Sequence, residues 1–310
     1  MMPVAPSLII RPLQGDERNL IADALNAALA DAPFTTPFNT AELYEQLYSP
    51  NPPSLHPVRW QQLQRIAAWR ARRLEGFIDV ATGFDSESQE RPEYSPVGLL
   101  RFLLLLDQSE RTDAVAIALL EAAEQFWQAQ GVGHVKAFHH STGYPNFQAG
   151  LGAVPGDWSA EVRALTGAGY HFTERFYCLT RPLTDPVEET IPLAQLSVVY
   201  GGSAADRIYQ LYRRNDWVGM ARVVNIHLEG AIGGHRLAKL VHMEVDPAWR
   251  GQDIGKWLLR RIINDSTIQG SSQLVAHVSQ RQAVALSLLT QLGFMEEDYR
   301  GYSLEKDLTA

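Results

Sequence analysis

The pattern of apolar and polar positions shifts repeatedly between two periods along the chain. Strand patterns, either alternating or a short continuous apolar run, occur at Leu8–Pro12, Leu74–Thr82, Gly98–Leu106, Trp217–Leu228, Arg236–Val245, Leu274–Val278 and Tyr299–Leu304. A helical pattern occurs at Asp16–Ala30, Ala114–Gln130, Ala204–Arg214, Ile254–Asp265 and Gln282–Gln291. The Gln- and Arg-rich stretch after Pro50–Pro57 is predicted to be helical or mixed. Strands that alternate with helices in each half predict an α/β fold with a mixed α+β sheet.

Two distant segments repeat one pattern. Leu165, Thr166 and Gly169 precede Leu289, Thr290 and Gly293 by a constant 124 residues. Each segment ends a helix at a glycine and continues as an alternating aromatic strand. Further upstream, Asp107 and Arg111 precede Asp246 and Arg250 by 139 residues.

The unequal offsets predict 15 extra residues in the first copy, within the Gly- and Pro-rich Phe138–Trp158. Chance similarity of short strand–helix patterns is the alternative.

A boundary fits between the two copies. A chain of 310 residues is about twice the ~150-residue expectation for one domain. Arg181–Pro192 holds three prolines and is typical of an extended linker, so we predict domains at 1–185 and 186–310. The first carries 21 acidic and 14 basic residues, the second 14 and 13. The nearly neutral second half suits an anionic ligand better.

Composition excludes several classes. A net charge of −8 argues against nucleic-acid or membrane binding through a global basic field. Cys178 is the only cysteine, so the chain forms no internal disulfide and no Cys-rich metal site. The longest apolar stretch, Leu99–Leu106, is interrupted by Arg101 and is too short to span a bilayer. With no signal-like N-terminus, we expect a cytoplasmic protein without a metal.

The segment from Lys239 to Leu259 is the most informative for chemistry. A strand ends near Pro247, a tight turn contains Gly251, and a helix starts near Ile254. The N–H groups at such a helix start are unpaired and bind phosphate readily, helped by the positive end of the helix dipole. Arg250 and Lys256 add positive charge for a pyrophosphate. The Gly-Lys-Ser/Thr ending of a Walker A loop does not occur.

This segment resembles the acetyl-CoA loop of the GNAT acetyltransferase superfamily. Val245-Asp-Pro247, Arg250-Gly-Gln-Asp-Ile-Gly255 and a downstream Leu292-Gly-Phe294 match the family pattern in order, over about residues 195–308. The resemblance implies two tandem GNAT-like modules, organised as in mycothiol synthase, with acetyl-CoA as co-substrate. The residues implied to bind it are Met243, Val245, Arg250, Gly251, Gln252, Asp253, Ile254, Gly255, Lys256 and Gln282.

The resemblance also implies catalytic groups. Backbone N–H groups around Met243–Val245 would hold the thioester carbonyl, and Glu244 would remove the amine proton, often through water. His242 shares the face of Glu244 by the period of two and is a second candidate base. Solvated or hydrogen-bonded strand residues are the alternative interpretation of both.

Three positions depart from the family pattern. Asp253 replaces the first loop glycine, where its carboxylate could crowd or repel a pyrophosphate, although Asp also favours a helix start. Leu289 stands where many members have the Tyr that protonates the CoA thiolate, and core packing is its simplest role. Gln282 stands where an Asn is frequent. Tyr299 and Tyr302 could supply the phenol or simply pack in a strand.

The first half has no glycine in Arg111–Ala116, the segment equivalent to the loop. We therefore expect residues 1–185 to be a degenerate module that is structural or shapes the substrate site.

The predicted function is transfer of an acetyl group from acetyl-CoA to an amine by direct attack. A small amine, an aminoglycoside-like sugar, an amino acid or a protein N-terminus would each fit, and the oligomeric state stays open. The alternative is a catalytically inactive GNAT-like scaffold that senses acyl-CoA or binds proteins. A phosphate-binding enzyme of another kind, such as a nucleotide transferase, is disfavoured because the sequence has no carboxylate cluster suited to Mg²⁺.

Overall fold

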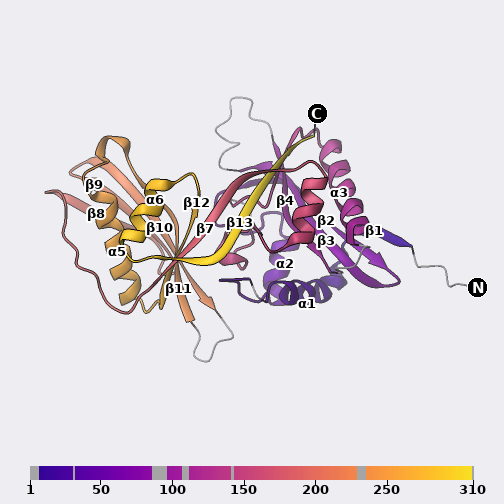
Figure 1. The fold of residues 1–310 in the computed structure, drawn as a ribbon, viewed down its shortest axis with the longest axis horizontal. Coiled ribbons are helices and arrows are strands. Elements are labelled where there is room, and N and C mark those ends of the chain that lie inside the picture. The colour runs from indigo at the N-terminus through magenta and orange to yellow at the C-terminus, as the bar shows by residue number, and fades with distance from the viewer. Residues whose placement is uncertain are drawn as a thin grey trace, which may run out of the picture. The chain divides into compact units, whose positions relative to one another are not determined.

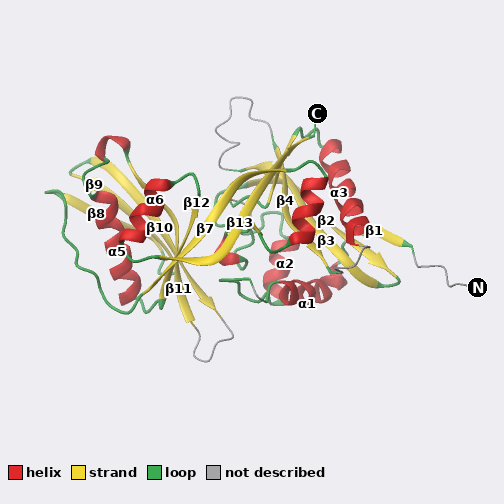
Figure 2. Cartoon of the chain, viewed as in Figure 1, coloured by secondary structure: helices red, strands yellow, loops and turns green. Residues whose placement is uncertain are grey.

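The computed structural model describes residues 7–30, 32–85, 96–106, 112–140, 143–228 and 235–308. Its α-helices are α1 (Arg18–Ala28), α2 (Thr40–Tyr48), α3 (Thr112–Ala129), α4 (Ser159–Gly167), α5 (Ile254–Ile268) and α6 (Ala283–Gln291). Its strands are β1 (Leu8–Pro12), β2 (Arg59–Arg70), β3 (Arg73–Phe84), β4 (Val97–Leu105), β5 (His134–Ala137), β6 (Val154–Pro155), β7 (His171–Pro182), β8 (Leu196–Gly202), β9 (Asp206–Arg213), β10 (Asp216–Leu228), β11 (His235–Val245), β12 (Gln273–Ser279) and β13 (Met295–Asp307). Figures 1 and 2 show their arrangement.

The chain forms two compact units. Unit 1 comprises residues 1–175 and 300–310, and unit 2 comprises residues 176–299. In unit 1 the strands follow the order β1-β2-β3-β4-β5-β13, and in unit 2 the order β7-β12-β11-β10-β9-β8. Strands β7 and β13 each run through both units. Unit 1 therefore contains the end of β13, and unit 2 contains the end of β7. The predicted boundary at 185/186 separates the two sequence copies, whereas the two units are defined by their internal contacts. The boundary therefore stays a prediction.

Each unit has its own apolar core. In unit 1, α3 and α4 cover one face of the sheet, with Leu119 and Leu165 in that core, while α1 and α2 cover the other face. In unit 2, α5 and α6 cover one face, with Ile262 and Leu289 in the core. Figure 2 shows both helices of unit 2 packed on the same side of its strands. Leu289 is 3% exposed, which confirms its packing role.

The two units repeat one order of elements, a parallel β-α-β unit followed by a helix and a strand. Helix α6 begins 124 residues after α4, and β13 begins 124 residues after β7. Gly169 and Gly293 end the two helices with φ of +89° and +79°, a conformation that glycine adopts without the steric cost of a side chain. Strands β5 and β12 begin 139 residues apart, so the extra 15 residues lie between β5 and α4, as predicted.

Two predicted elements are wrong. Ala204–Arg214 is not a helix: it holds the β8–β9 turn and strand β9, in which Tyr209 and Leu211 are buried and Gln210 between them is not. The Gln- and Arg-rich stretch after Pro57 is strand β2, which pairs along its length with β3. In both cases cross-strand pairing outweighs the helix propensity of Gln, Arg and Ala.

No helix within the described residues is long and apolar enough to cross a membrane.

Candidate functional site

The strands β11 and β12 separate at their carboxyl ends. They pair in parallel only from Leu237 with Gln273 to Leu240 with Ala276, although β11 continues to Val245 and β12 to Ser279. The pairing of β11 with β10 shifts by one residue between His242 and Leu240, which leaves Val241 as a β-bulge. A bulge bends its strand and ends pairing locally, so it accounts for the opening between the two strands.

Backbone groups of β11 point into this opening. The Asp246 N–H donates to Val218 O on β10 at 2.9 Å. Because backbone groups of an antiparallel strand alternate between its two sides, the N–H groups of Met243 and Val245 are directed away from β10, toward the β12 side. These are two of the residues that we predicted to hold the thioester carbonyl.

The turn after β11 is held by short-range hydrogen bonds. The Asp246 carboxylate accepts a bond from the Ala248 N–H at 2.8 Å within a 3-10 turn at Pro247–Trp249. The Arg250 Nε donates to Val245 O at 2.9 Å, which holds the guanidinium group at the end of β11. Gly251 has φ of +75°, and a side chain there would meet nothing within 4 Å.

Helix α5 starts with unpaired donors. Trp257 makes the first bond of the helix, to Asp253 O at 3.0 Å. The N–H groups of Ile254, Gly255 and Lys256 therefore precede the first intrahelical bond, and they have no acceptor within the described part of the chain. With the helix dipole they form an anion-binding helix start.

Asp253 stands in a backbone conformation that glycine adopts without steric cost. Its φ is +56° and its ψ +12°, in the left-handed region, and its exposed side chain makes no capping bond. Asp enters this region more readily than most residues. The turn thus keeps its shape without glycine, but a carboxylate stands beside the donors of Ile254 and Gly255.

The predicted bases lie side by side. His242 and Glu244 are exposed by 47% and 44% of their side chains, and His242 Nε2 lies 3.5 Å from Glu244 Oε1. They occupy the sheet face opposite to α5 and α6, because their neighbours Met243 and Val245 pack on the helix side. On the neighbouring strand β10, Arg222 lies opposite His242 and Met220 lies opposite Glu244. Arg222 forms a salt bridge with Asp206 at 2.6 Å.

Within the described residues, Gln282 forms no hydrogen bond with the turn between β11 and α5. It precedes α6 as its N-cap residue, and its side chain is exposed and makes no capping bond. Tyr302 lies in unit 1 with its ring 5.1 Å from Phe172, which favours its packing role. Tyr299 is partly buried on β13.

Unit 1 has apolar residues where unit 2 has its candidate bases. A bulge at Arg101 in β4 matches the bulge at Val241, so Phe102 corresponds to His242 and Leu104 to Glu244. Both are buried in the core beneath α1 and α2. The predicted counterparts of the loop, Asp107 and Arg111, lie outside the described residues.

The segment between β5 and α4, which we call the inserted chain, covers the corresponding face of the unit 1 sheet. Tyr144 and Phe147 place their rings 5.4 and 5.5 Å from that of Phe102. The Tyr144 hydroxyl donates to Asp79 at 2.6 Å, and Asp79 also pairs with the fully buried Arg101 at 2.9 Å.

The sequence reasoning missed a group of buried polar residues in unit 2. His277, Lys239 and Cys178 lie on the face of His242 and Glu244, on β12, β11 and β7, with Cys178 opposite His277. Both ring nitrogens of His277 are buried without a hydrogen-bond partner in the described chain. Burial, and secondarily the Lys239 charge, holds the pKa of His277 well below its usual value. The signal for it was a histidine within the apolar strand Leu274–Val278.

Lys239 is 5% exposed. Burial lowers the pKa of its amine to about 7, against a smaller opposing effect of Cys178. A buried amine with such a pKa is neutral for part of the time near neutral pH.

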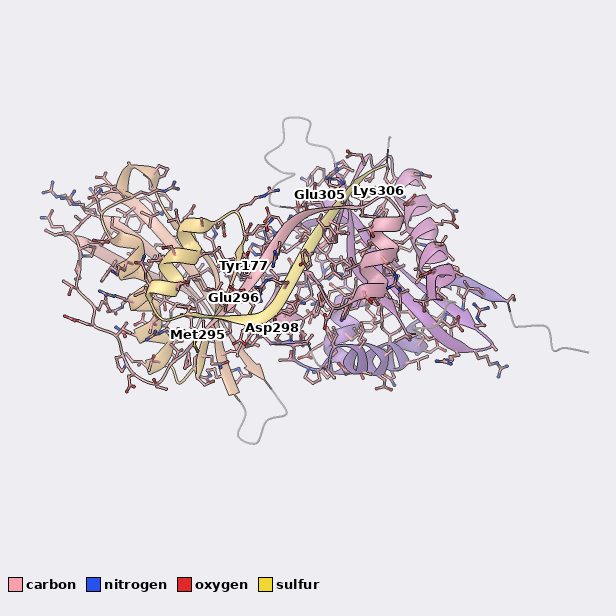
Figure 3. All side chains as sticks on the ribbon, in the orientation of Figure 1. Tyr177, Met295, Glu296, Asp298, Glu305 and Lys306 are labelled. Carbon is pink, nitrogen blue, oxygen red and sulfur yellow. The ribbon has the colours of Figure 1, made fainter. Side chains whose placement is uncertain are left out.

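A separate cavity of about 550 Å³ lies in unit 2 where α6 meets β7 and the start of β13. Figure 3 labels three residues of its lining, Tyr177, Met295 and Glu296. None of the predicted site residues lines it. Within the described residues no group of three or more His, Cys, Asp or Glu side chains is arranged to hold a metal ion.

Part of unit 2 matches a known domain family. Residues 204–296 match the family model of the acetyltransferase (GNAT) domain. A search of curated proteins returns no match.

Solved structures extend the likeness to the whole chain. A tandem GNAT protein from the clavulanic acid biosynthesis pathway is 14% identical with a TM-score of 0.66, and the match covers 97% of this chain and 98% of that one. A GCN5-related N-acetyltransferase from Sphaerobacter thermophilus is 12% identical with a TM-score of 0.62, over 98% and 97% of the chains. A glucosamine N-acetyltransferase region of a fungal multi-domain β-N-acetylglucosaminidase is 13% identical with a TM-score of 0.70, over 98% of this chain and 38% of that one.

Residues 204–296 of unit 2 thus match the acetyltransferase (GNAT) domain model. The chain as a whole has the fold of tandem GNAT proteins.

Proposed function

We propose that unit 2 transfers an acetyl group from acetyl-CoA to an amine. One observation carries the proposal: β11 and β12 stop pairing before β11 ends, and the turn after β11 continues into the unpaired helix start of α5. Donors for a thioester carbonyl (Met243 and Val245) and donors for a pyrophosphate (Ile254 to Lys256) thus lie at the same end of the sheet. A thioester joined to a pyrophosphate by a flexible arm is the chemistry of an acyl-CoA.

The phosphate end combines backbone donors with side-chain charge. Arg250 holds its own guanidinium at the turn through Val245 O, and Lys256 lies in the first turn of α5. Gly255 faces Val245 and Leu288, and a Cβ added there would lie 3.8 Å from each. A methyl group therefore fits at this position, whereas a carboxylate would place negative charge next to the phosphates.

The reaction we propose is direct attack. A neutral amine forms a C–N bond to the carbonyl carbon while the Met243 or Val245 N–H stabilises the developing oxyanion. Glu244, with His242 at 3.5 Å, receives the amine proton directly or through water. The C–S bond then breaks and the CoA thiolate takes up a proton. Leu289 has no proton to donate, so water supplies it.

The first experiment is calorimetric titration of acetyl-CoA into the full chain. We expect binding by wild type and by Gly255→Ala, and its loss in Gly255→Asp. Gly167→Asp is the matched control, because Gly167 lies exposed in a helix of unit 1 with nothing within 4 Å of an added Cβ. Absence of binding by a folded wild-type chain at millimolar acetyl-CoA would contradict the proposal.

The second experiment separates binding from catalysis. Thiol release with a panel of amines should fall about 10²-fold or more in Glu244→Gln, while acetyl-CoA binding is retained. Turnover in Glu244→Gln equal to wild type would remove this residue from the mechanism. Acetyl-CoA binding without thiol release from any amine would favour the alternative, an acyl-CoA-sensing scaffold.

A further inference from the structure

Strand β8 forms one edge of the unit 2 sheet. It pairs with β9 alone, without a register shift, from Leu196 with Arg213 to Gly202 with Arg207. Figure 1 shows it as the outermost strand beyond β9. Edge strands are usually protected by charge, proline, a bulge or a covering segment, since their free backbone groups template pairing with another chain. Residues 195–205 contain neither a charged residue nor a proline.

The alternation of backbone bonds identifies the free groups. The Ser203 N–H donates to Asp206 O at 2.8 Å, and the Arg214 N–H donates to Gln195 O at 3.3 Å. These two bonds fix the inward-facing residues as the odd-numbered ones, so Val198, Tyr200 and Gly202 direct their N–H and C=O groups outward. No residue in the described part of the chain bonds to them.

The central side chain of the edge strand is anchored within unit 2. The Tyr200 hydroxyl accepts from Arg261 Nε at 2.9 Å and donates to Asp265 at 3.0 Å, and its ring packs on Tyr209 at 5.4 Å. Yet Val199 and Tyr200 remain 49% and 45% exposed. An apolar, uncharged edge whose central side chain is already hydrogen-bonded loses less side-chain entropy on pairing.

We propose that β8 pairs antiparallel with β8 of a second copy of this chain, around a twofold axis at Tyr200. In this register Tyr200 meets Tyr200, and Val198 meets Gly202 of the other copy. Val199 then lies opposite Gly201, so each valine faces a glycine and the aromatic pair is central. No like charges oppose one another within 197–203. The contact is self-complementary, as a twofold interface must be.

The test begins with light scattering on the purified full chain across a concentration series. We expect a mass of twice 34.6 kDa. Val198→Pro removes an outward N–H without touching a bond to β9, and it should give a monomer. Val198→Thr keeps the N–H and should remain a dimer. Circular dichroism and acetyl-CoA binding check that both variants fold.

Cross-linking tests the register independently of stability. Under oxidation Tyr200→Cys should form a symmetric disulfide, because directly opposed Cα atoms lie about 5.5 Å apart. Val198→Cys is the matched control: two copies would be separated by four residues along the strand, about 14 Å, and should not cross-link. Native Cys178 is buried in both. A monomeric wild type, a dimer that survives Val198→Pro, or equal cross-linking of both cysteine variants would each overturn the proposal.

Discussion

At the scale of single residues, Asp253 shows how one side chain can alter a site while preserving its shape. Its left-handed conformation keeps the turn, but its carboxylate lies beside the free N–H groups of Ile254 and Gly255. Asp253→Asn retains the tolerance for this conformation and removes the charge. We expect it to tighten acetyl-CoA binding several-fold, and less at high salt, because exposed charges are screened. Calorimetry at low and high ionic strength measures this.

An unchanged affinity in Asp253→Asn at low salt would mean that the carboxylate points away from the ligand. Asp253→Gly serves as the control for backbone conformation, since glycine also adopts φ of +56° at no cost.

The buried Lys239 makes the free energy of unfolding depend on pH. Burial lowers its amine pKa to about 7 from 10.5 in the unfolded chain. Between these values the unfolded state binds more protons, so this residue makes stability rise with pH from about 7 to about 10. Below pH 7 the amine is protonated in both states and its cost is constant. We expect Lys239→Met to raise the free energy of unfolding near pH 7 and to flatten this rise.

Urea unfolding at a series of pH values measures the Lys239 effect. Lys256→Met is the control for the loss of a lysine at a partly buried position of the same unit. The same slope in Lys239→Met and wild type would show that the buried amine does not titrate in this range.

At the scale of elements, the inserted chain of unit 1 closes the face that is open to His242 and Glu244 in unit 2. The bond from Tyr144 to the buried Asp79 fastens it. Tyr144→Phe should lower the free energy of unfolding by about 1.5–3 kcal/mol, the usual value of a hydrogen bond to a charged group. Tyr48→Phe, which loses an exposed bond to Gln14 O, should cost less. If unit 1 is structural, thiol release by folded Tyr144→Phe equals that of wild type.

The elements also show what the sequence could and could not predict. The β11–α5 segment was predictable because its turn, glycine and apolar helix are local features, and their order resembles a family motif. Strands β2 and β9 were not, since their conformation depends on pairing with distant strands. The His277 group was missed for the same reason. Its members come from three strands, and only the register of β7, β12 and β11 brings them together.

At the scale of the whole molecule, two similar units carry unequal chemistry. Unit 2 has two exposed candidate bases, His242 and Glu244, whereas unit 1 has the buried Phe102 and Leu104 at the matching places. Most of the net negative charge also lies in residues 1–185, where it opposes binding of an anion.

This asymmetry predicts which part of the intact chain acetyl-CoA will bind. In hydrogen-exchange mass spectrometry, saturating acetyl-CoA should slow exchange in peptides spanning 243–256, because the N–H groups of Met243, Val245 and the start of α5 gain acceptors. Peptides from α3 in unit 1 should exchange at the same rate with and without ligand. Coenzyme A without the acetyl group is the control: it should protect the start of α5 but leave Met243 and Val245 less protected, since it has no thioester carbonyl. Protection of α3 by acetyl-CoA would instead reveal a second site in unit 1, and the two copies would then share the binding function that we assign to one.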